Sequence, residues 1–451
     1  MRIVIGDDSA FMKFGTGLLM IRGRGRWLGL LAGGLGVGDG MGGGVVVMGD
    51  SLSKEYSVTF LGIGGNLAAG HIRNWSEILE ERRGDVFGMG SFGVFGDWRL
   101  TGHAQNWSIP GSMASEWRER LSYPGMVPAG LETQLRGGAD RVVIWLGGND
   151  VRVKYGDLYD GRPSGEWAER LVADVVAVME FVRARNRLIP LVVCGVPHVG
   201  ATPSRNEAYP YDPVKTGRAT AVLDGVNLRL RRAAEGMGAG YAEVYEVTRE
   251  LVTAERWVCG GWRIEKRSSS GGEPDALFLG DDFHPNWPAQ AVFAQRIVDA
   301  FNQLEGGRIP RLTNREIVGD VLGQDAGLTL NQWARGYGIV DGDRGWGDDP
   351  DGDGLKNVVE FAFDLDPLRH DRDLMPVPWW DGDRLALAWQ PRDQSNATWA
   401  RITVQESAGG GEWKAVPSGS VINPGGGVRM VRRTGGTAGR MWLRFQVQPL
   451  P

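Results

Sequence analysis

Three short apolar runs, each closely followed by glycine or polar residues, constrain the fold of this 451-residue chain more than any other feature. They occupy residues 45–48, 142–146 and 188–195, with a fourth candidate at residues 242–247. Continuous apolar runs of this length are typical of parallel strands that are buried on both faces. Helical patterns are predicted between and after them, at residues 72–82, 168–185, 220–234 and 288–302. This alternation predicts a three-layer α/β/α domain around a parallel sheet.

A candidate nucleophile follows the first apolar run. Ser51 comes after Gly49 and Asp50, so it lies where the first strand should end. Open α/β sheets bind their ligands in the crevice at the carboxyl ends of their strands. A serine hydroxyl becomes a good nucleophile when a neighbouring base takes its proton. Taken alone, Ser51 is also compatible with an ordinary turn or helix-cap serine.

His284 is the candidate base. Among the five histidines, it is the one with an aspartate, Asp281, three residues before it. Such an acid can fix the imidazole tautomer and stabilise the imidazolium that forms during attack. Two alternatives stay open, namely Asp282 as the acid and His198 as the base. The structural alternative for His284 is a loop residue before a helix, since Pro285 suits a turn.

Acyl transfer also needs hydrogen-bond donors where the carbonyl oxygen becomes an anion. Asn149, in G-G-N-D after the second run, can offer its side-chain amide. Gly111, in N-W-S-I-P-G, can offer a backbone N–H that no side chain blocks, and the N–H of Ser51 is a third donor. The segment G-I-G-G-N at residues 62–66 is a rival to the Gly111 block.

The four blocks V-V-V-M-G-D-S-L-S, N-W-S-I-P-G, W-L-G-G-N-D and D-D-F-H-P-N, in this order, resemble the SGNH (GDSL-type) hydrolase family over about residues 45–301. Its members are mostly esterases, lipases and carbohydrate deacetylases with a flavodoxin-like fold. The resemblance implies a triad of Ser51, Asp281 and His284 and an oxyanion hole of Ser51, Gly111 and Asn149, with no catalytic cofactor. Asn106, five residues before Gly111 as in the family pattern, favours this glycine over residues 62–66.

A second motif lies beyond this region. D-P-D-G-D-G-L-K-N-V-V-E, at residues 349–360, matches the calcium-loop template D-x-D-x-D-G-x5-E, with Gly354 at the sharp turn. The predicted ligands at loop positions 1, 3, 5, 7 and 12 are Asp349, Asp351, Asp353, Leu355 through its carbonyl, and Glu360. The segment resembles dockerin and thrombospondin type 3 loops, which implies a structural Ca²⁺. Lys356 at position 8 predicts an isolated loop, and a solvated acidic turn is the alternative.

The stretches after Pro376 alternate apolar and polar residues between glycine-rich turns, which predicts a small antiparallel β-domain of the sandwich type. This module could contact glycans or a cell surface, or it could be a passive stability module. The predicted organisation is a signal segment (1–38), a hydrolase domain (39–305), a linker with the calcium loop (306–370) and the β-domain (371–451).

The beginning of the chain predicts export. Arg22, Arg24 and Arg26 precede the apolar stretch W-L-G-L-L-A-G-G-L-G-V, as in a signal peptide with translation from Met20 and cleavage near Gly38. A glycine-rich lead-in is the alternative. We therefore expect a secreted, periplasmic or cell-surface protein, and no later stretch is long and apolar enough to predict a membrane span.

Composition agrees with a globular protein. The chain is 42% hydrophobic with a net charge of −5, which favours a sizeable core and gives no indication of a nucleic-acid surface. The chain has two cysteines, Cys194 and Cys259, and the sequence alone does not decide whether they pair in a disulfide. The main hypothesis is a secreted serine esterase acting on ester bonds, with O-acetyl groups of polysaccharides as candidate substrates. The alternatives are a lipid esterase, a non-catalytic glycan- or surface-binding protein on a hydrolase scaffold, and a calcium-stabilised adhesin.

Overall fold

The computed structural model describes residues 5–6, 9–14, 17–21, 44–59, 72–123, 125–254, 256–259, 262–270, 273–307, 309–313, 315–322, 329–363, 365–381, 384–389, 399–408, 412–425, 428–434 and 441–449. Its contacts divide the chain into two units, Met1–Met41 and Gly42–Pro451. The first unit contains an antiparallel sheet of β1 (Ile5–Gly6), β2 (Ser9–Phe14) and β3 (Gly17–Ile21). Of the predicted signal segment at residues 1–38, the part from residue 22 onward lies outside the described residues.

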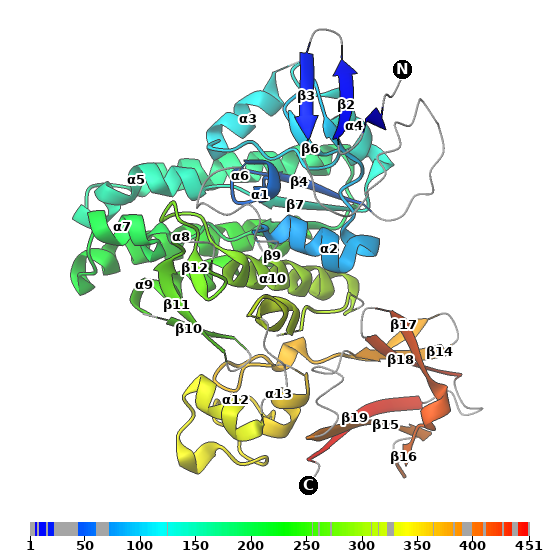
Figure 1. Cartoon of the computed structure of the whole chain (residues 1–451). Helices are drawn as coiled ribbons and strands as arrows, with labels where there is room; N and C mark the ends of the chain where they lie inside the picture. The colour runs from blue at the N-terminus through cyan, green and yellow to red at the C-terminus, as the bar shows by residue number, and fades with distance from the viewer. Residues whose placement is uncertain are drawn as a thin grey trace. The chain divides into compact units, whose positions relative to one another are not determined.

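The second unit is built on a parallel sheet with the strand order β4-β7-β8-β9 (Figure 1). Its strands are β4 (Val45–Gly49), β7 (Arg141–Trp145), β8 (Leu191–Cys194) and β9 (Gly240–Ala242). The three main apolar runs therefore form the strands that their sequence predicts. The predicted strand at residues 242–247 is wrong, because the chain leaves the sheet at Ala242 and α9 (Val244–Thr253) begins. Val244, Val247 and Leu251 recur at helical spacing and are buried, so they pack as one helix face.

Successive strand residues face two different apolar cores, which defines three layers. Val47 and Val143 pack with α2 (Trp75–Phe87) and α10 (Trp287–Glu305) on one face of the sheet. Val46 and Ile144 pack on the other face. The helices of that second face are α3 (Ala114–Ser122), α5 (Gly148–Asp160), α6 (Gly165–Arg185) and α8 (Pro213–Gly236). The predicted three-layer α/β/α architecture is confirmed.

Smaller elements complete this region. They are α1 (Tyr56–Thr59), β5 (Phe92–Val94), β6 (Thr101–His103), α4 (Ala129–Thr133), η1 (Gln134–Gly138), η2 (Val199–Ala201), α7 (Pro203–Ala208), β10 (Arg256–Cys259), β11 (Trp262–Ser268), β12 (Ala276–Phe278), η3 (Arg315–Gly319) and α11 (Asp320–Leu322). Cys194 on β8 is a buried, free thiol, so it does not form the disulfide that the sequence left undecided.

Among the described residues, every helix is too short or too polar to span a bilayer.

The described elements from residue 329 onward are short helices and two antiparallel sheets. The helices are α12 (Leu330–Tyr337), η4 (Asp341–Asp343), α13 (Asn357–Phe363), η5 (Arg372–Leu374) and η7 (Ser418–Ser420). One sheet has the order β13 (Trp379–Asp381), β14 (Arg384–Trp389), β18 (Val428–Thr434), β17 (Val421–Gly425), and the other β16 (Lys414–Ala415), β15 (Ala400–Ala408), β19 (Met441–Pro449). Leu387 and Val404, from different sheets, share one apolar core with Leu355 and Phe363. The predicted antiparallel β region is confirmed.

Candidate functional site

The nucleophile candidate lies in a tight turn at the carboxyl end of β4. The backbone N–H groups of Ser53 and Lys54 donate to the Asp50 carbonyl at 3.2 and 3.0 Å, which closes the turn around Ser51. Gly49 permits this geometry, because a Cβ there would lie 2.7 Å from the Ser53 side chain. Ser51 is only 8% exposed, so most of its surface is held by protein.

Ser51, His284 and Asp281 form a continuous chain of hydrogen bonds. The Ser51 Oγ lies 2.9 Å from His284 Nε2, and His284 Nδ1 lies 2.5 Å from Asp281 Oδ2. The other oxygen, Asp281 Oδ1, accepts from the backbone N–H groups of Phe283 and His284 at 3.1 and 2.9 Å. The acid that orients His284 is therefore Asp281 rather than the alternative, Asp282.

The charge on Asp281 fixes which nitrogen of His284 carries the proton. Burial opposes ionisation of Asp281, but the hydrogen bond and the charge of His284 outweigh it, so the net pKa of this carboxyl is lowered. An ionised Asp281 can only accept, so Nδ1 of His284 must donate to it. Nε2 then presents its lone pair to the Ser51 hydroxyl, as a general base requires.

The three predicted oxyanion donors differ in their surroundings. Asn149 lies in the first turn of α5, and its amide donates to Asp50 Oδ2 at 3.3 Å and to the Ser112 carbonyl at 3.2 Å. Gly111 has a φ of +79° in an exposed turn. Within the described part of the chain, the backbone N–H groups of Ser51 and Gly111 have no hydrogen-bond partner. The rival block at residues 62–66 lies outside the described residues.

Asn106 ties the Gly111 segment to the nucleophile turn. Its amide donates to the Ser53 carbonyl at 2.9 Å, and its backbone pairs with Val47 beside the sheet. The N–H of Ile109 then donates to the Gly49 carbonyl at 2.9 Å. These contacts bring the N-W-S-I-P-G block to the carboxyl end of β4, next to the turn that carries Ser51.

Two buried carboxyls that the sequence did not single out are Asp50, which accepts from the Asn149 amide, and Asp150, the next residue in the chain. Burial raises the pKa of Asp50 to about 7, and it raises the pKa of Asp150, which accepts from the Ala114 N–H at 3.1 Å, to about 6. Both acids belong to motifs that were recognised, the D of G-D-S and the final D of G-G-N-D. Their position beside the serine and asparagine was the available signal, and their contacts fix the Asn149 side chain and the start of α3.

An apolar cavity opens beside the nucleophile. It is lined by Ser51 and Asn149 together with Leu52, Trp145, Pro197, His198, Val199, Ala201, Leu251, Phe278, Phe283, Pro285 and Phe293, among others. His198, the alternative base, hydrogen-bonds through Nε2 to Thr220 Oγ1 at 3.1 Å, whereas Ser51 contacts His284. Burial lowers the pKa of His198 to about 4, so it is a neutral wall residue.

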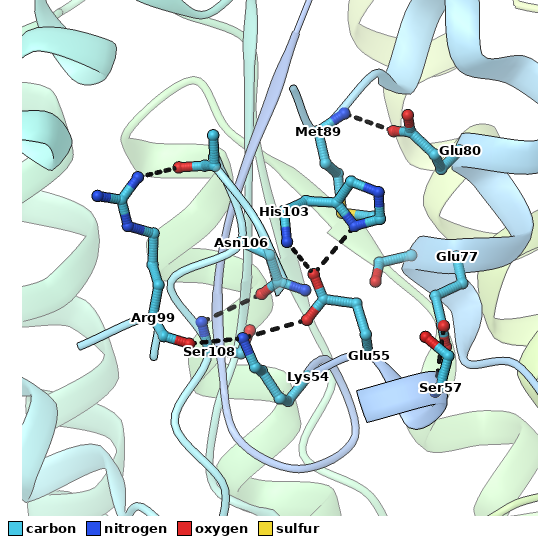
Figure 2. A network of polar contacts seen from close by, with 12 residues as sticks. Lys54, Glu55, Ser57, Glu77, Glu80, Met89, Arg99, His103, Asn106 and Ser108 are labelled. Carbon is cyan, nitrogen blue, oxygen red and sulfur yellow. Dashed lines mark hydrogen bonds and ion pairs between the residues drawn. The ribbon is translucent and has the colours of Figure 1, made fainter. Parts of the chain in front are cut away.

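A buried ionic network connects the residues that follow the nucleophile turn to β6. Figure 2 shows Glu55 between Lys54 and His103. Lys54 Nζ lies 3.2 Å from Glu55 Oε2, and His103 donates its backbone N–H to Glu55 Oε1 at 2.8 Å, with Nδ1 3.1 Å from the same oxygen. Glycine suits position 102 beside this network, because its φ of +143° is rare for other residues and a Cβ there would lie 2.7 Å from Lys54 Nζ. The network fastens the residues that follow Ser51 to β6.

The predicted calcium loop folds back on its own aspartates. Asp349 accepts through its two oxygens from the N–H groups of Gly352 and Gly354, both at 3.0 Å, and Asp351 accepts from the N–H of Asp353 at 3.0 Å. The two glycines have φ values of +77° and +90°. Carboxylate oxygens of Asp349, Asp351 and Asp353 lie within 4.8 Å of one another.

The fifth predicted ligand residue tests whether a cation fits here. Glu360 is 0% exposed, and neither of its carboxylate oxygens has a hydrogen-bond partner among the described residues, as is also true of Asp351 Oδ2. Burial, followed by the charges of Asp351, Asp371 and Asp353, raises the pKa of Glu360 to about 9. Unpartnered buried carboxylates are strongly unfavourable, and hard oxygen ligands suit Ca²⁺. The residues present therefore fit a divalent cation.

No protein-family model matches this chain, and no curated protein matches it. Similar solved structures include an acetylxylan esterase from Geobacillus stearothermophilus, 14% identical over 58% of this chain and 95% of that chain, with a TM-score of 0.32. A lipase from a goat rumen metagenome is 14% identical over 59% of this chain and 99% of that chain, with a TM-score of 0.36. A carbohydrate esterase family 3 structure from Talaromyces cellulolyticus is 15% identical over 58% and 97%, with a TM-score of 0.33. Similarities this low carry no inference about activity.

Proposed function

We propose that this protein is a serine ester hydrolase of the SGNH type that acts through an acyl-enzyme. The observation that carries the proposal is the unbroken chain of hydrogen bonds from Asp281 through His284 to Ser51. A nucleophile, a base and an orienting acid in this order are the functional core of serine hydrolases. Their position at the carboxyl end of a strand, beside a cavity, gives an ester access to them.

The proposed reaction has two halves. Nε2 of His284 takes the proton of the Ser51 hydroxyl while the Ser51 oxygen attacks the ester carbonyl. Asp281 stabilises the imidazolium that forms on His284. His284 then gives this proton to the leaving alcohol, so that the C–O bond breaks and an acyl-Ser51 ester remains. In the second half, water loses a proton to His284 and attacks the acyl group, and His284 returns the proton to Ser51 as the acid departs.

The oxyanion that forms at each attack needs fixed donors. The N–H groups of Ser51 and Gly111, which have no partner in the described part of the chain, are proposed as two of them. The Asn149 amide is the third, and its contacts of 3.3 Å to Asp50 and 3.2 Å to Ser112 lie at the long end of the N–H···O range. A charged oxyanion makes a stronger hydrogen bond than the Ser112 carbonyl, so it can recruit this amide.

The cavity supports a carboxylic ester as substrate. We propose that its apolar wall, including Trp145, Phe278 and Phe293, receives the acyl group. O-acetyl groups of an extracellular polysaccharide are the proposed physiological target, and export is proposed with them. The apolar lining equally favours the second candidate, a lipid ester, because a longer acyl chain would bury more apolar surface there.

The first test is hydrolysis of p-nitrophenyl acetate, butyrate and octanoate. Ser51→Ala should lower turnover by about 10⁶-fold, because the nucleophile and its base act as a unit. An exposed serine gives the matched control, and Ser122→Ala should leave turnover unchanged. Equal hydrolysis by wild type and Ser51→Ala would contradict the proposal. The preferred acyl length distinguishes an acetylesterase from a lipid esterase.

We also propose that the loop at residues 349–360 binds a structural Ca²⁺. The unpartnered oxygens of Glu360 and Asp351 support this proposal. The ion would be held by Asp349, Asp351, Asp353, Glu360 and the Leu355 carbonyl, and it would neutralise carboxylates that otherwise repel one another. The proposed ester hydrolysis at Ser51 does not involve this ion.

A further inference from the structure

A carboxylate from outside the calcium loop lies against it. Asp371 follows the 12-residue loop and the helix α13, and it belongs to no position of the loop template. The residue is only 7% exposed, so its carboxyl group is almost entirely enclosed by protein. Asp371 Oδ2 accepts from the Asp366 N–H at 2.9 Å, whereas Oδ1 has no hydrogen-bond partner among the described residues.

Several hydrogen bonds hold this segment against the loop. The backbone N–H groups of Asp371 and Arg372 donate to Asp353 Oδ2 at 3.0 and 2.9 Å. His370 Nε2 lies 2.6 Å from the Asp351 carbonyl oxygen, and the Arg372 guanidinium donates to the Asp353 carbonyl at 3.3 Å. Asp371 is thus fixed beside two of the predicted ligand residues.

Buried carboxylate oxygens without a hydrogen-bond partner in the described residues occur on α13 and on the segment that follows it. Within the described part of the chain, Glu360 on α13 has both carboxylate oxygens unpaired, and Asp371 on the following segment has one. The Asp371 backbone N–H donates to Asp353 Oδ2 at 3.0 Å, so this carboxyl belongs to a residue in direct contact with the loop. A buried carboxylate oxygen without a partner is unfavourable unless a cation or a proton satisfies it.

We propose that Asp371 is a further calcium ligand, which closes the site from outside the loop. The inference rests on the proposed calcium binding and adds a residue that the loop template does not contain. The ion then joins three segments, namely the loop, α13 and residues 370–372. Leu355 and Phe363, on either side of Glu360 in the sequence, belong to the apolar core of the two antiparallel sheets. Calcium binding therefore stabilises the start of that core.

Calcium titration of the full chain by isothermal calorimetry, after metal removal, tests the proposal. Asp371→Asn keeps the side-chain shape and removes the charge, and it should weaken Ca²⁺ binding at least about tenfold, because affinity depends on the number of charged ligands. Asp351→Asn is the positive control for the loop. Asp373→Asn, an exposed aspartate two residues along the chain, is the matched control and should bind as wild type does.

A stability measurement distinguishes a ligand from a merely structural residue. Without calcium, Asp371→Asn should unfold at the same or a higher temperature than wild type, because it removes a repelled charge. With calcium it should gain less stability than wild type. Wild-type affinity in Asp371→Asn beside a weakened Asp351→Asn would overturn the role of Asp371. Absence of binding by wild type would overturn the calcium site itself, and ester hydrolysis, measured separately, would be unaffected by either outcome.

Discussion

The proposed catalytic site and the proposed calcium loop each contain a carboxyl shielded from solvent, Asp281 partly and Glu360 fully, yet these acids are satisfied in opposite ways. Asp281 accepts from two backbone N–H groups and from His284, so its partners all come from the chain. Glu360 is buried with both oxygens unpartnered among the described residues, and Asp371 has one such oxygen. The acid of the first site has all its partners in the protein, whereas we propose that the acids of the second take a cation from solution.

The directions of the pKa shifts express the same difference. Burial raises the pKa of both acids, but at Asp281 the hydrogen bond and charge of His284 reverse the result. At Glu360 the neighbouring charges are negative, so they add to burial and the pKa reaches about 9. The partners of a carboxylate thus separate one that orients a neighbouring base from one that we propose holds a metal ion.

Breaking the complete site should give the largest effect. In Asp281→Asn, the side-chain oxygen can keep the backbone N–H bonds of Phe283 and His284, which leaves the NH₂ group facing His284 Nδ1. Nδ1 must then accept, so Nε2 carries the proton and cannot take one from Ser51. We expect kcat for p-nitrophenyl acetate to fall about 10⁴-fold.

The folded state should tolerate this change. Thermal unfolding and calcium binding of Asp281→Asn should remain close to those of wild type, because the altered contacts lie at the catalytic site. Asp282→Asn provides the matched control, since the His284 ring is held by Asp281 instead, and its activity should be retained. A strong loss in Asp282→Asn with little loss in Asp281→Asn would reverse the assignment of the acid.

Removing calcium should have a smaller effect, confined to stability. A ligand at 100 times its dissociation constant stabilises the folded state by about 2.7 kcal/mol. Adding a chelator should therefore lower the unfolding temperature. The region of Glu360 and the antiparallel sheets should unfold first. Ester hydrolysis at about 25 °C should be unchanged. If chelation abolished hydrolysis while the protein stayed folded, the two sites would not be independent.

The fold was largely predictable because its strands are short apolar runs buried on both faces. The error at residues 242–247 has a physical cause, since A-E-V-Y-E-V fits alternation over a few residues as well as it fits a helix. Leu251, four residues after Val247, extends the buried face at helical spacing and makes the helix the stable choice. Periodicity over so short a window does not distinguish the two.

Motifs could predict site residues that are local in sequence but not those that meet only in space. The D-x-x-H spacing indicated Asp281, and the structure places it on His284. The calcium template ends at Glu360, so it does not include Asp371. The contact of Asp371 with the loop depends on the path of the chain after α13. Likewise, no pattern linked Glu55 to His103, because their contact depends on β6 lying beside the nucleophile turn.

The network of Lys54, Glu55 and His103 should give the smallest effect, and it should depend on pH (Figure 2). Burial opposes charge on His103, but Glu55 outweighs it, so the pKa of His103 is raised, and His103 with Lys54 in turn lowers the pKa of Glu55. A raised histidine pKa gives stability that is present below about 6.5, the unfolded value, and is lost as pH rises through the folded value. A lowered glutamate pKa gives stability that is present above about 4.5 and is lost as pH falls through the folded value.

The contribution of the charged His103 should therefore be greatest near pH 5 to 6, about midway between these limits. His103→Gln keeps the backbone donor to Glu55 and can replace the side-chain hydrogen bond, but it cannot carry the charge. We expect it to be about 1 kcal/mol less stable than wild type near that pH, and the difference should shrink towards about pH 8.5. Chemical unfolding with calcium present measures both proteins. A difference that stays constant or grows with rising pH would show that the charge on His103 does not stabilise the nucleophile turn.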